Sequence, residues 1–372
     1  MHPEALPLLV LSRVKKMGAI TIRKLIENES VGTASHIFDH YEHIEGLQAG
    51  ARQNIREALH NKALWHECQQ ILDRAEAEGI TVLTLFDQEY PHRLKSCIDA
   101  PPLIFYRGKR DLLSSEYKVS IVGTRGATRY GEATTIKIVE GLCKAIPDLV
   151  VVSGLARGID IIAHRAALAC AASTIAVLGF GHHHLYPYEH RADFDKIATE
   201  GGLLSEYPPD EKSEAGKFVA RNRIIAALAP ATIVVESRAK GGALITAEMA
   251  LSYNHEVFAV PGRLSDEYSA GCNQLIAAMK AAIFNSVEEF LEHMNWGAKH
   301  SQPQVPLLGL KPTLPGDPIS ALIAQEETIL FNDLLRKSGM PAAELHTKLM
   351  ELELEGYIEA LPGGKYAISY NL

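Results

Sequence analysis

Four segments rich in glycine, arginine or both decide the fold of this chain: IVGTRGATRYG (121–131), VVSGLARGID (151–160), ARNRIIAALAPATIVVE (220–236) and KGGALITAEMA (240–250). Glycine allows a backbone to approach a ligand closely, and arginine supplies a fixed fork of hydrogen-bond donors. Several such turns along one parallel sheet predict a surface that holds phosphate groups.

Strand-like and helical segments alternate on either side of these turns. Strands are expected within residues 119–123, 148–154, 173–179, 201–206, 231–237, 255–262 and 281–284, with helices between them. The strands are nearly continuous apolar runs, as expected when both faces of a sheet are covered. This alternation predicts an α/β protein with a doubly wound parallel sheet, whose ligands bind at the carboxyl ends of the strands.

Other patterns flank this core. Residues 1–65 read as a helical N-terminal domain, and residues 66–80 as a helix. Extended segments at 81–87 and 101–109 would add to the sheet, so the core domain is expected at 66–294. Residues 295–316 are rich in proline and glycine and predict a linker. The remainder, 317–372, reads as helix, turn, helix and two short strands, the pattern of a winged helix.

The N-terminal domain allows two interpretations. Two short helices around Met17-Gly18 resemble a small helix-hairpin-helix or SAM-like unit, which can bind a DNA backbone through turn amides and Lys15, Lys16 and Lys24. The alternative, a helical packing module, is favoured because the turn lacks the second glycine of the usual hairpin.

Composition limits the class of protein. The 372 residues are 47% hydrophobic and 22% charged, which is ordinary for a globular protein and suggests two or three domains. No run of 18 apolar residues predicts a membrane span, and the N-terminus does not read as a secretory signal. Five scattered cysteines without CxxC spacing favour a reducing cytoplasm over a disulfide frame or a zinc knuckle.

The charge of the chain is unusual for a phosphate binder. The net charge is −8, and residues 314–372 alone carry four basic and nine acidic side chains, a net charge of −5. Any phosphate site must therefore be a local concentration of arginine and lysine, which the glycine turns provide.

The first two turns supply the first candidate phosphate ligands. Thr124 and Arg125 follow a strand and precede a helix that begins near Tyr130, whose free amides and dipole would face an anion. In the second turn, Gly154 and Gly158 flank Arg157, a second candidate clamp. Asp160, which follows, is expected to cap the next helix.

The third and fourth turns add more candidates. Arg221-Asn222-Arg223 opens an apolar helix just after Lys217-Phe218. The two arginines point in different directions, so one can face a ligand while the other pairs with Glu206 or Glu236. Phe218 is equally consistent with stacking on a base and with a place in the core. Lys240-Gly241-Gly242 precedes another helix and predicts an anion-binding nest.

The sequence argues against several other sites. His182-His183-His184 cannot all converge on one ion, so a polar loop is expected and no metal site. There is no GxxxxGK[ST], no GxGxxG with an acidic ribose partner and no GxSxG, so P-loop ATP hydrolysis, a dinucleotide cofactor and a hydrolase of the GxSxG type are not predicted.

Taken together in their order, these motifs resemble the DNA-processing protein A (DprA/Smf) family of bacteria. The matching segments are IVGTR…ATRYG, VVSGLARGID, TIAVLG (174–179), GLLSEYPP (202–209), RNRIIAAL (221–228), GGALITAEMA, VFAVPG (257–262) and GCNQLI (271–276). Together they are specific and, with the helical N-terminus and winged-helix tail, the resemblance spans nearly the whole chain.

The resemblance implies an extended Rossmann fold that binds single-stranded DNA and assembles as a homodimer. It also implies loading of the RecA recombinase onto incoming single strands during natural transformation, without catalysis or cofactor. Carried over by motif, the phosphate-binding residues would be Thr124, Arg125, Gly154, Arg157, Gly158, Lys217, Arg221, Asn222, Arg223, Lys240, Gly241 and Gly242.

The chain departs from the family pattern in three places. Phe180 replaces the usual cysteine, and His182-His183-His184 lacks the usual aspartate. Val219 replaces the usual proline, and Ala220 an often basic residue. The third departure is the acidic tail, because an acidic winged helix is a poor DNA reader. We expect this unit to contact protein or to modulate dimerisation.

Two other functions remain open. The sheet and glycine pair are similar to those of nucleotide-ribosyl hydrolases, in which Glu248 would be the catalytic carboxylate, although a structural ion pair is expected there. A transcription regulator that uses the winged helix is the second alternative, and the acidic segment 342–355 speaks against it.

Overall fold

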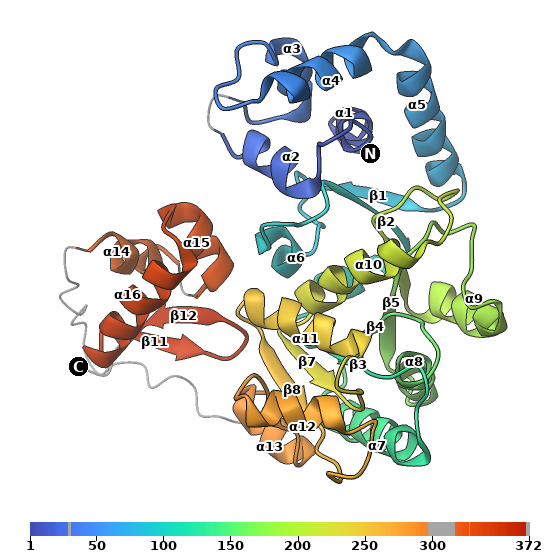
Figure 1. Cartoon of the computed structure of the whole chain (residues 1–372), viewed down its shortest axis with the longest axis vertical. Coiled ribbons are helices and arrows are strands. Elements are labelled where there is room, and N and C mark those ends of the chain that lie inside the picture. The colour runs from blue at the N-terminus through green and yellow to red at the C-terminus, as the bar shows by residue number, and fades with distance from the viewer. Residues whose placement is uncertain (29–30, 297–316, 327, 370–372) are drawn as a thin grey trace.

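The N-terminal helices form a small bundle in the computed structural model, which describes residues 1–28, 31–296, 317–326 and 328–369 (Figure 1). These helices are α1 (Ala5–Ser12), α2 (Ala19–Ile26), α3 (Ala34–His40), α4 (Ala49–His60) and α5 (Lys62–Ala77). Met17 and Val14, at the connection between α1 and α2, are buried in the apolar core of this bundle. Their burial is consistent with the packing interpretation of this helix pair.

Helix α5 differs from its predicted span. It begins at Lys62 because the side chain of Asn61 accepts a hydrogen bond from the Leu64 amide at 3.1 Å. The expected domain boundary between residues 65 and 66 therefore falls inside a helix. The core of the bundle also takes in Val82 and Phe105 from the first two strands, so bundle and sheet share apolar packing.

Nine strands form the main sheet, in the order β1-β2-β6-β5-β4-β3-β7-β8-β9. Their bounds are β1 (Thr81–Thr84), β2 (Leu103–Gly108), β3 (Lys118–Val122), β4 (Val150–Ser153), β5 (Ser173–Leu178), β6 (Gly202–Ser205), β7 (Ala231–Val234), β8 (Glu256–Ala259) and β9 (Ala282–Ile283). Strands β3 to β9 pair in parallel, whereas β2 pairs antiparallel with both β6 and β1. This confirms the predicted parallel sheet and its two-strand extension.

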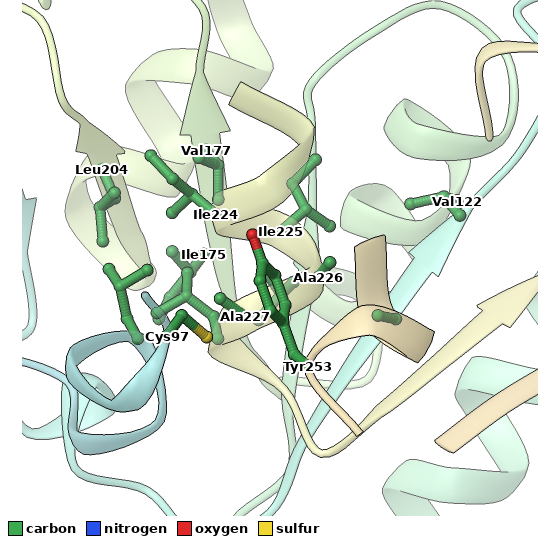
Figure 2. Close-up of a cluster of buried hydrophobic side chains, with 14 of the residues drawn as sticks. Cys97, Val122, Ile175, Val177, Leu204, Ile224, Ile225, Ala226, Ala227 and Tyr253 are labelled. Carbon is green, nitrogen blue, oxygen red and sulfur yellow. The ribbon is translucent and has the colours of Figure 1, made fainter. Parts of the chain in front are cut away.

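Helices cover both faces of the sheet, which confirms the doubly wound arrangement. Alternate residues of β4 point to opposite sides: Val150 and Val152 pack in one core cluster and Val151 in the other. The first cluster includes Ile224 of α10, which lies near Val177 of β5 and Leu204 of β6 (Figure 2), and Ile225, whose carbonyl oxygen accepts a hydrogen bond from Ser120 of β3. The helices are α6 (His92–Ser96), α7 (Arg129–Ala145), α8 (Ile159–Ala169), α9 (Arg191–Glu200), α10 (Ala215–Leu228), α11 (Gly242–Ser252), α12 (Ala270–Ala277) and α13 (Val287–His293).

The strand order reverses next to β3. The chain leaves β3 toward β4 on one side and later returns as β7 on the other. A reversal of this kind opens a crevice at the carboxyl ends of the two central strands, because the helices that follow them pack on opposite faces. The first and fourth glycine turns both lie at this crevice.

The C-terminal residues form the predicted winged helix: α14 (Pro318–Ala324), β10 (Ile329–Leu330), α15 (Phe331–Ser338), α16 (Ala342–Leu354), β11 (Ile358–Leu361) and β12 (Lys365–Ile368). The predicted turn at Gly339 is left-handed, with φ of 66°. Of the predicted linker 295–316, all but residues 295 and 296 lie outside the described residues.

The winged-helix unit lies against the core (Figure 1). Ser96 of α6 donates a hydrogen bond to Asp333 at 3.0 Å, and Asn332 donates to the carbonyl oxygen of Tyr253 at 3.0 Å. Arg93 donates to the carbonyl oxygen of Gly363, in the turn between β11 and β12, at 2.9 Å. The tip of the wing is thus packed against the core.

Within the described ranges, the structure holds no helix of the length and apolarity needed to cross a bilayer.

Candidate functional site

A pocket of about 480 Å³ opens at the reversal point of the sheet. Its walls come from the turns after β3 and β7 and from the first half of α10. It collects eight of the thirteen residues named from the sequence: Thr124, Arg125, Phe218, Arg221, Asn222, Lys240, Gly241 and Gly242. The volume lies within the usual range of roughly 300 to 1,000 Å³ for ligand pockets.

The turn after β3 is fixed by a buried carboxylate. Glu236, 2% exposed, accepts hydrogen bonds from the amide of Thr128 at 3.0 Å and from its hydroxyl at 2.5 Å. Thr128 in turn caps α7, accepting from the Gly131 amide. This anchoring leaves Arg125 exposed at the pocket, where it forms no ion pair with any described residue.

The turn after β7 brings a second unpaired cation. Lys240 is exposed and lines the pocket, and no described carboxylate lies within ion-pair distance of it. Gly241, next in sequence, is the N-cap of α11, and no side chain caps this eleven-residue helix. The first amides of α11 therefore face the pocket without a side-chain acceptor. A Cβ on Gly241 would meet the Ser237 hydroxyl at 2.2 Å, whereas one on Gly242 would meet nothing within 4 Å.

Arg221 forms the buried floor of the pocket. It is 3% exposed and donates to the carbonyl oxygens of Gly154, at 2.5 Å, and Val177. Burial lowers the pKa of Arg221 to about 10, so it is still a cation at neutral pH. Its charge acts on the pocket from below, while its Nη1 donates to these two carbonyl oxygens and its Nε donates to the side-chain oxygen of Asn222 at 3.2 Å.

The two glycines of the second turn support this arrangement from outside the pocket. A Cβ on Gly154 would lie 2.5 Å from the Arg221 guanidinium. Gly158 has φ of 74°, and a Cβ there would lie 2.2 Å from the carbonyl oxygen of Thr124. Both positions need glycine for close packing against neighbouring protein atoms.

The expected capping role of Asp160 is wrong. The N-cap of α8 is Gly158, two residues before Asp160, and Asp160 lies buried within the first turn of the helix. Its carboxylate accepts hydrogen bonds from the amides of Gly154 and Ala156. Burial raises the pKa of Asp160, and the nearby Arg221 partly offsets that rise.

Three predicted cations lie outside the pocket, each held by a carboxylate. Arg157 makes two hydrogen bonds to Glu189, at 2.8 and 2.9 Å. Lys217 pairs with Glu211 at 2.5 Å and with Glu214 at 3.3 Å. Arg223 pairs with Glu206 on the far side of α10, which is one of the two arrangements expected for the Arg221/Arg223 pair.

The ring of Phe218 packs against other aromatic rings and also lines the pocket. It packs against Phe180, at a centroid distance of 6.3 Å, and against Tyr186, at 5.5 Å. The Arg125 guanidinium lies 5.9 Å from its centroid. The ring is half-buried and lines the pocket, so one side is available to a planar group.

The sequence does not predict two large polar side chains of the pocket, Arg238 and Tyr268. Arg238 follows β7 and lies over the ring of Tyr268 at 4.6 Å, while its side chain also approaches Glu267 at 3.3 Å. Arg238 stands two residues before Lys240, so its position in the same turn was a usable signal. Tyr268 lies in a segment without any motif.

The lining of the pocket is cationic although the chain is acidic. It contains the four cations Arg125, Arg221, Arg238 and Lys240, and one carboxylate, Asp160. The uncapped amino-terminal end of α11 borders the same space and adds the positive end of its dipole. Such a site favours an anion with several oxygens.

The alternative catalytic carboxylate lies elsewhere. Glu248 is exposed on α11 and pairs with Lys280 at 2.7 Å, as the ion-pair interpretation expected, and it does not line the pocket. Of the three histidines, His182 is buried and bonded to the Leu203 carbonyl, and His183 lies between Glu78 and Asp210. Among the described residues, no group of three or more histidine, cysteine, aspartate or glutamate side chains is placed to hold a metal ion.

Comparison with known proteins gives a consistent result. The family model of DNA recombination-mediator protein A matches residues 81–295, and a DprA winged-helix model matches residues 316–364. The DNA processing protein DprA of Bacillus subtilis is 37% identical over 264 residues, which cover 69% of this chain and 87% of that protein. The protein Smf of Synechocystis is 35% identical over 332 residues, which cover 80% of this chain and 82% of that protein.

Solved structures agree with these matches. DNA processing protein A from Streptococcus pneumoniae superimposes with a TM-score of 0.62 at 33% identity, covering 78% of this chain and 98% of that one. DNA processing protein A from Helicobacter pylori, solved in work on its single-stranded DNA binding mode, superimposes with a TM-score of 0.52 at 32% identity. The match covers 57% of this chain and 94% of that one.

Proposed function

Since this chain belongs to the DNA recombination-mediator protein A family, we propose that it binds single-stranded DNA in the pocket between the turns after β3 and β7. The single-stranded DNA binding mode described for the Helicobacter pylori relative supports this ligand. The observation that carries the proposal is a cationic pocket with two unpaired cations, Arg125 and Lys240, in a chain whose net charge is −8.

We assign the contacts in the pocket as follows. Arg125 and Lys240 bind phosphate oxygens directly, and the amides of Gly241 and Gly242 bind the same or the next phosphate. Arg221 adds charge from below, and Phe218 offers its exposed side to a base. Contacts to phosphate carry no sequence information, so binding is largely independent of sequence.

The proposal extends to the role of the bound strand. We propose that the protein is not an enzyme but a mediator that protects incoming single strands and loads RecA on them during natural transformation, in the cytoplasm. The bonding of Asp160 to backbone amides and the pairing of Glu248 with Lys280 support a role without catalysis, because neither carboxylate is free.

We further propose that the protein works as a homodimer. Edge strand β9 supports this, because among the described strands only β8 pairs with it, and Ile283 is 50% exposed. Met279, just before it, is 93% exposed. Two joined pockets would bind one long strand more tightly without any new contact. Sedimentation of Met279→Asp/Ile283→Asp tests this, and an unchanged mass would contradict the assigned surface.

A salt series tests the DNA proposal. Fluorescence anisotropy of a labelled oligo-dT is measured against the wild type, Arg125→Ala and Lys240→Ala at several salt concentrations. Each variant should bind more weakly, and the slope of log K against log salt should fall by about 0.7 for each phosphate that the variant no longer neutralises. Duplex DNA of the same length should bind less well than the single strand.

Glu248→Gln is the matched control, because this exposed carboxylate lies outside the pocket. Its affinity and slope should equal those of the wild type. Equal affinity and slope for Arg125→Ala, Lys240→Ala and the wild type would contradict the pocket assignment. Turnover of a nucleoside monophosphate that Glu248→Gln abolishes would instead favour the hydrolase.

A further inference from the structure

Two exposed apolar side chains lie on the outer face of α16. Met350 is 65% exposed and Leu354 is 81% exposed. The buried residues of this helix, Leu345, Leu349 and Leu352, point the other way into the core of the winged-helix unit. Residues four apart share one face of a helix, so Met350 and Leu354 form a single patch, here called the outer patch.

Acidic side chains border the outer patch. At 100° per residue, Glu351 and Glu355 flank it on one side and Glu353 on the other, and all three are exposed. The one lysine of α16, Lys348, lies 3.5 Å from Glu351. His346 adds little positive charge, because burial lowers its pKa and its ring stacks on Phe331.

The acidic side chains around the outer patch exclude several classes of binding partner. An acidic helix repels the phosphates of duplex DNA and the headgroups of anionic lipids. Two copies of the patch facing each other would repel in the same way. The wing is also occupied, because a Cβ on Gly364 would lie 2.2 Å from the carbonyl oxygen of Asn254 in the core. The two elements with which winged helices contact DNA are thus unsuited to it here.

We propose that the outer patch of α16 binds an amphipathic helix of a partner protein that carries apolar anchors flanked by lysine or arginine. The apolar side chains of that helix would cover Met350 and Leu354. Its basic flanks would pair with Glu351, Glu353 and Glu355, as charged positions beside an apolar seam do between paired helices. This surface lies on the winged-helix unit and does not depend on the proposed DNA pocket.

The test uses the full chain and a defined probe. The probe is a fluorescein-labelled synthetic helix with leucines at i, i+4 and i+7 and lysines on both flanks, and anisotropy reports its binding. We expect saturable binding that Met350→Ser/Leu354→Ser weakens by about tenfold or more, because two apolar side chains that the probe would bury are removed. Glu351→Gln/Glu355→Gln should weaken it mainly at low salt.

The matched control is Leu264→Ser, which removes an apolar side chain that is 96% exposed on the core. Its affinity for the probe should equal that of the wild type, and a probe with serines in place of leucines should bind about tenfold more weakly or not at all. The proposal is overturned by absence of saturable binding, by equal affinity of Met350→Ser/Leu354→Ser and wild type, or by duplex DNA binding that this double variant abolishes.

Discussion

The backbone of Gly158 lies directly against Thr124, so that a Cβ on Gly158 would be 2.2 Å from the Thr124 carbonyl oxygen. The same oxygen accepts a hydrogen bond from the Ile159 amide at 3.2 Å. Through this contact the second glycine turn holds the first in place. The shape of the pocket near Arg125 therefore depends on residues that do not line it.

Gly158→Ala should lower the free energy of unfolding by about 2 kcal/mol or more, because φ of 74° strains a side chain and the Cβ collides with backbone. Urea denaturation measures the change. Gly216→Ala is the control: it lies in α10, and a Cβ there would meet nothing within 4 Å. The control should be neutral or stabilising. Equal stability of Gly158→Ala and the wild type would contradict this packing.

Gly242→Val should weaken single-strand binding by about tenfold while unfolding stays within about 0.5 kcal/mol of the wild type. The new side chain would occupy open space at the start of α11, where the phosphate is expected. Gly241→Ala should instead reduce stability, because its Cβ would meet Ser237. Thermal melts and anisotropy separate the two effects. Unchanged affinity in Gly242→Val would show that no phosphate approaches this helix end.

Arg157→Ala and Lys217→Ala should keep single-strand affinity within about twofold of the wild type, although both residues belong to the phosphate-binding set expected from sequence. Each is held by carboxylates outside the pocket, at Glu189 and at Glu211. Removing an exposed ion pair costs only about 0 to 1 kcal/mol of stability. A decrease in affinity as large as that of Arg125→Ala would mean that the bound strand extends beyond the pocket.

His183, which lies between Glu78 at the end of α5 and Asp210, should make the free energy of unfolding depend on pH. Burial lowers the pKa of His183, but hydrogen bonds to Asp210 and Glu78 outweigh burial and raise it above its ordinary value. A raised pKa contributes stability that is fully present below the unfolded value of about 6.5 and is lost as pH rises through the folded value.

The stability of the wild type relative to His183→Gln should therefore fall as pH increases from about 6 to 8. Denaturation curves at several pH values measure this difference. Asp210→Asn, which removes one of the two carboxylates bonded to His183, should reduce this trend. A difference between His183→Gln and wild type that does not vary with pH would rule out the linkage.

The sequence predicts the strands, the doubly wound parallel sheet and eight of the residues that line the pocket, because these follow from local patterns. Apolar runs and glycine turns define where strands end, and parallel strands end at one edge. Phe218 packs on Phe180 and Tyr186 and also lines the pocket, so it is partly a core residue, and its stacking on a base stays a prediction.

Ion pairing is harder to predict. The partner of Arg157 is Glu189, which lies 32 residues further along the chain, and no local pattern links the two. The glycine-flanked arginine therefore reads as free in the sequence although it is paired. The prediction for Asp160 is wrong for a related reason: the left-handed Gly158 starts α8 early, so the carboxylate falls inside the helix and binds amides of its own turn.

The ribbon formed by β1 and β2 has a practical consequence for work with fragments. One face of this ribbon, including Val82, Leu103 and Phe105, packs on the N-terminal bundle, and the other face packs on the core. A fragment that starts at residue 81, where the family match begins, would present these side chains to water beside an unprotected edge strand. Such a fragment should aggregate, so recombinant versions need α1 to α5 to stay in solution.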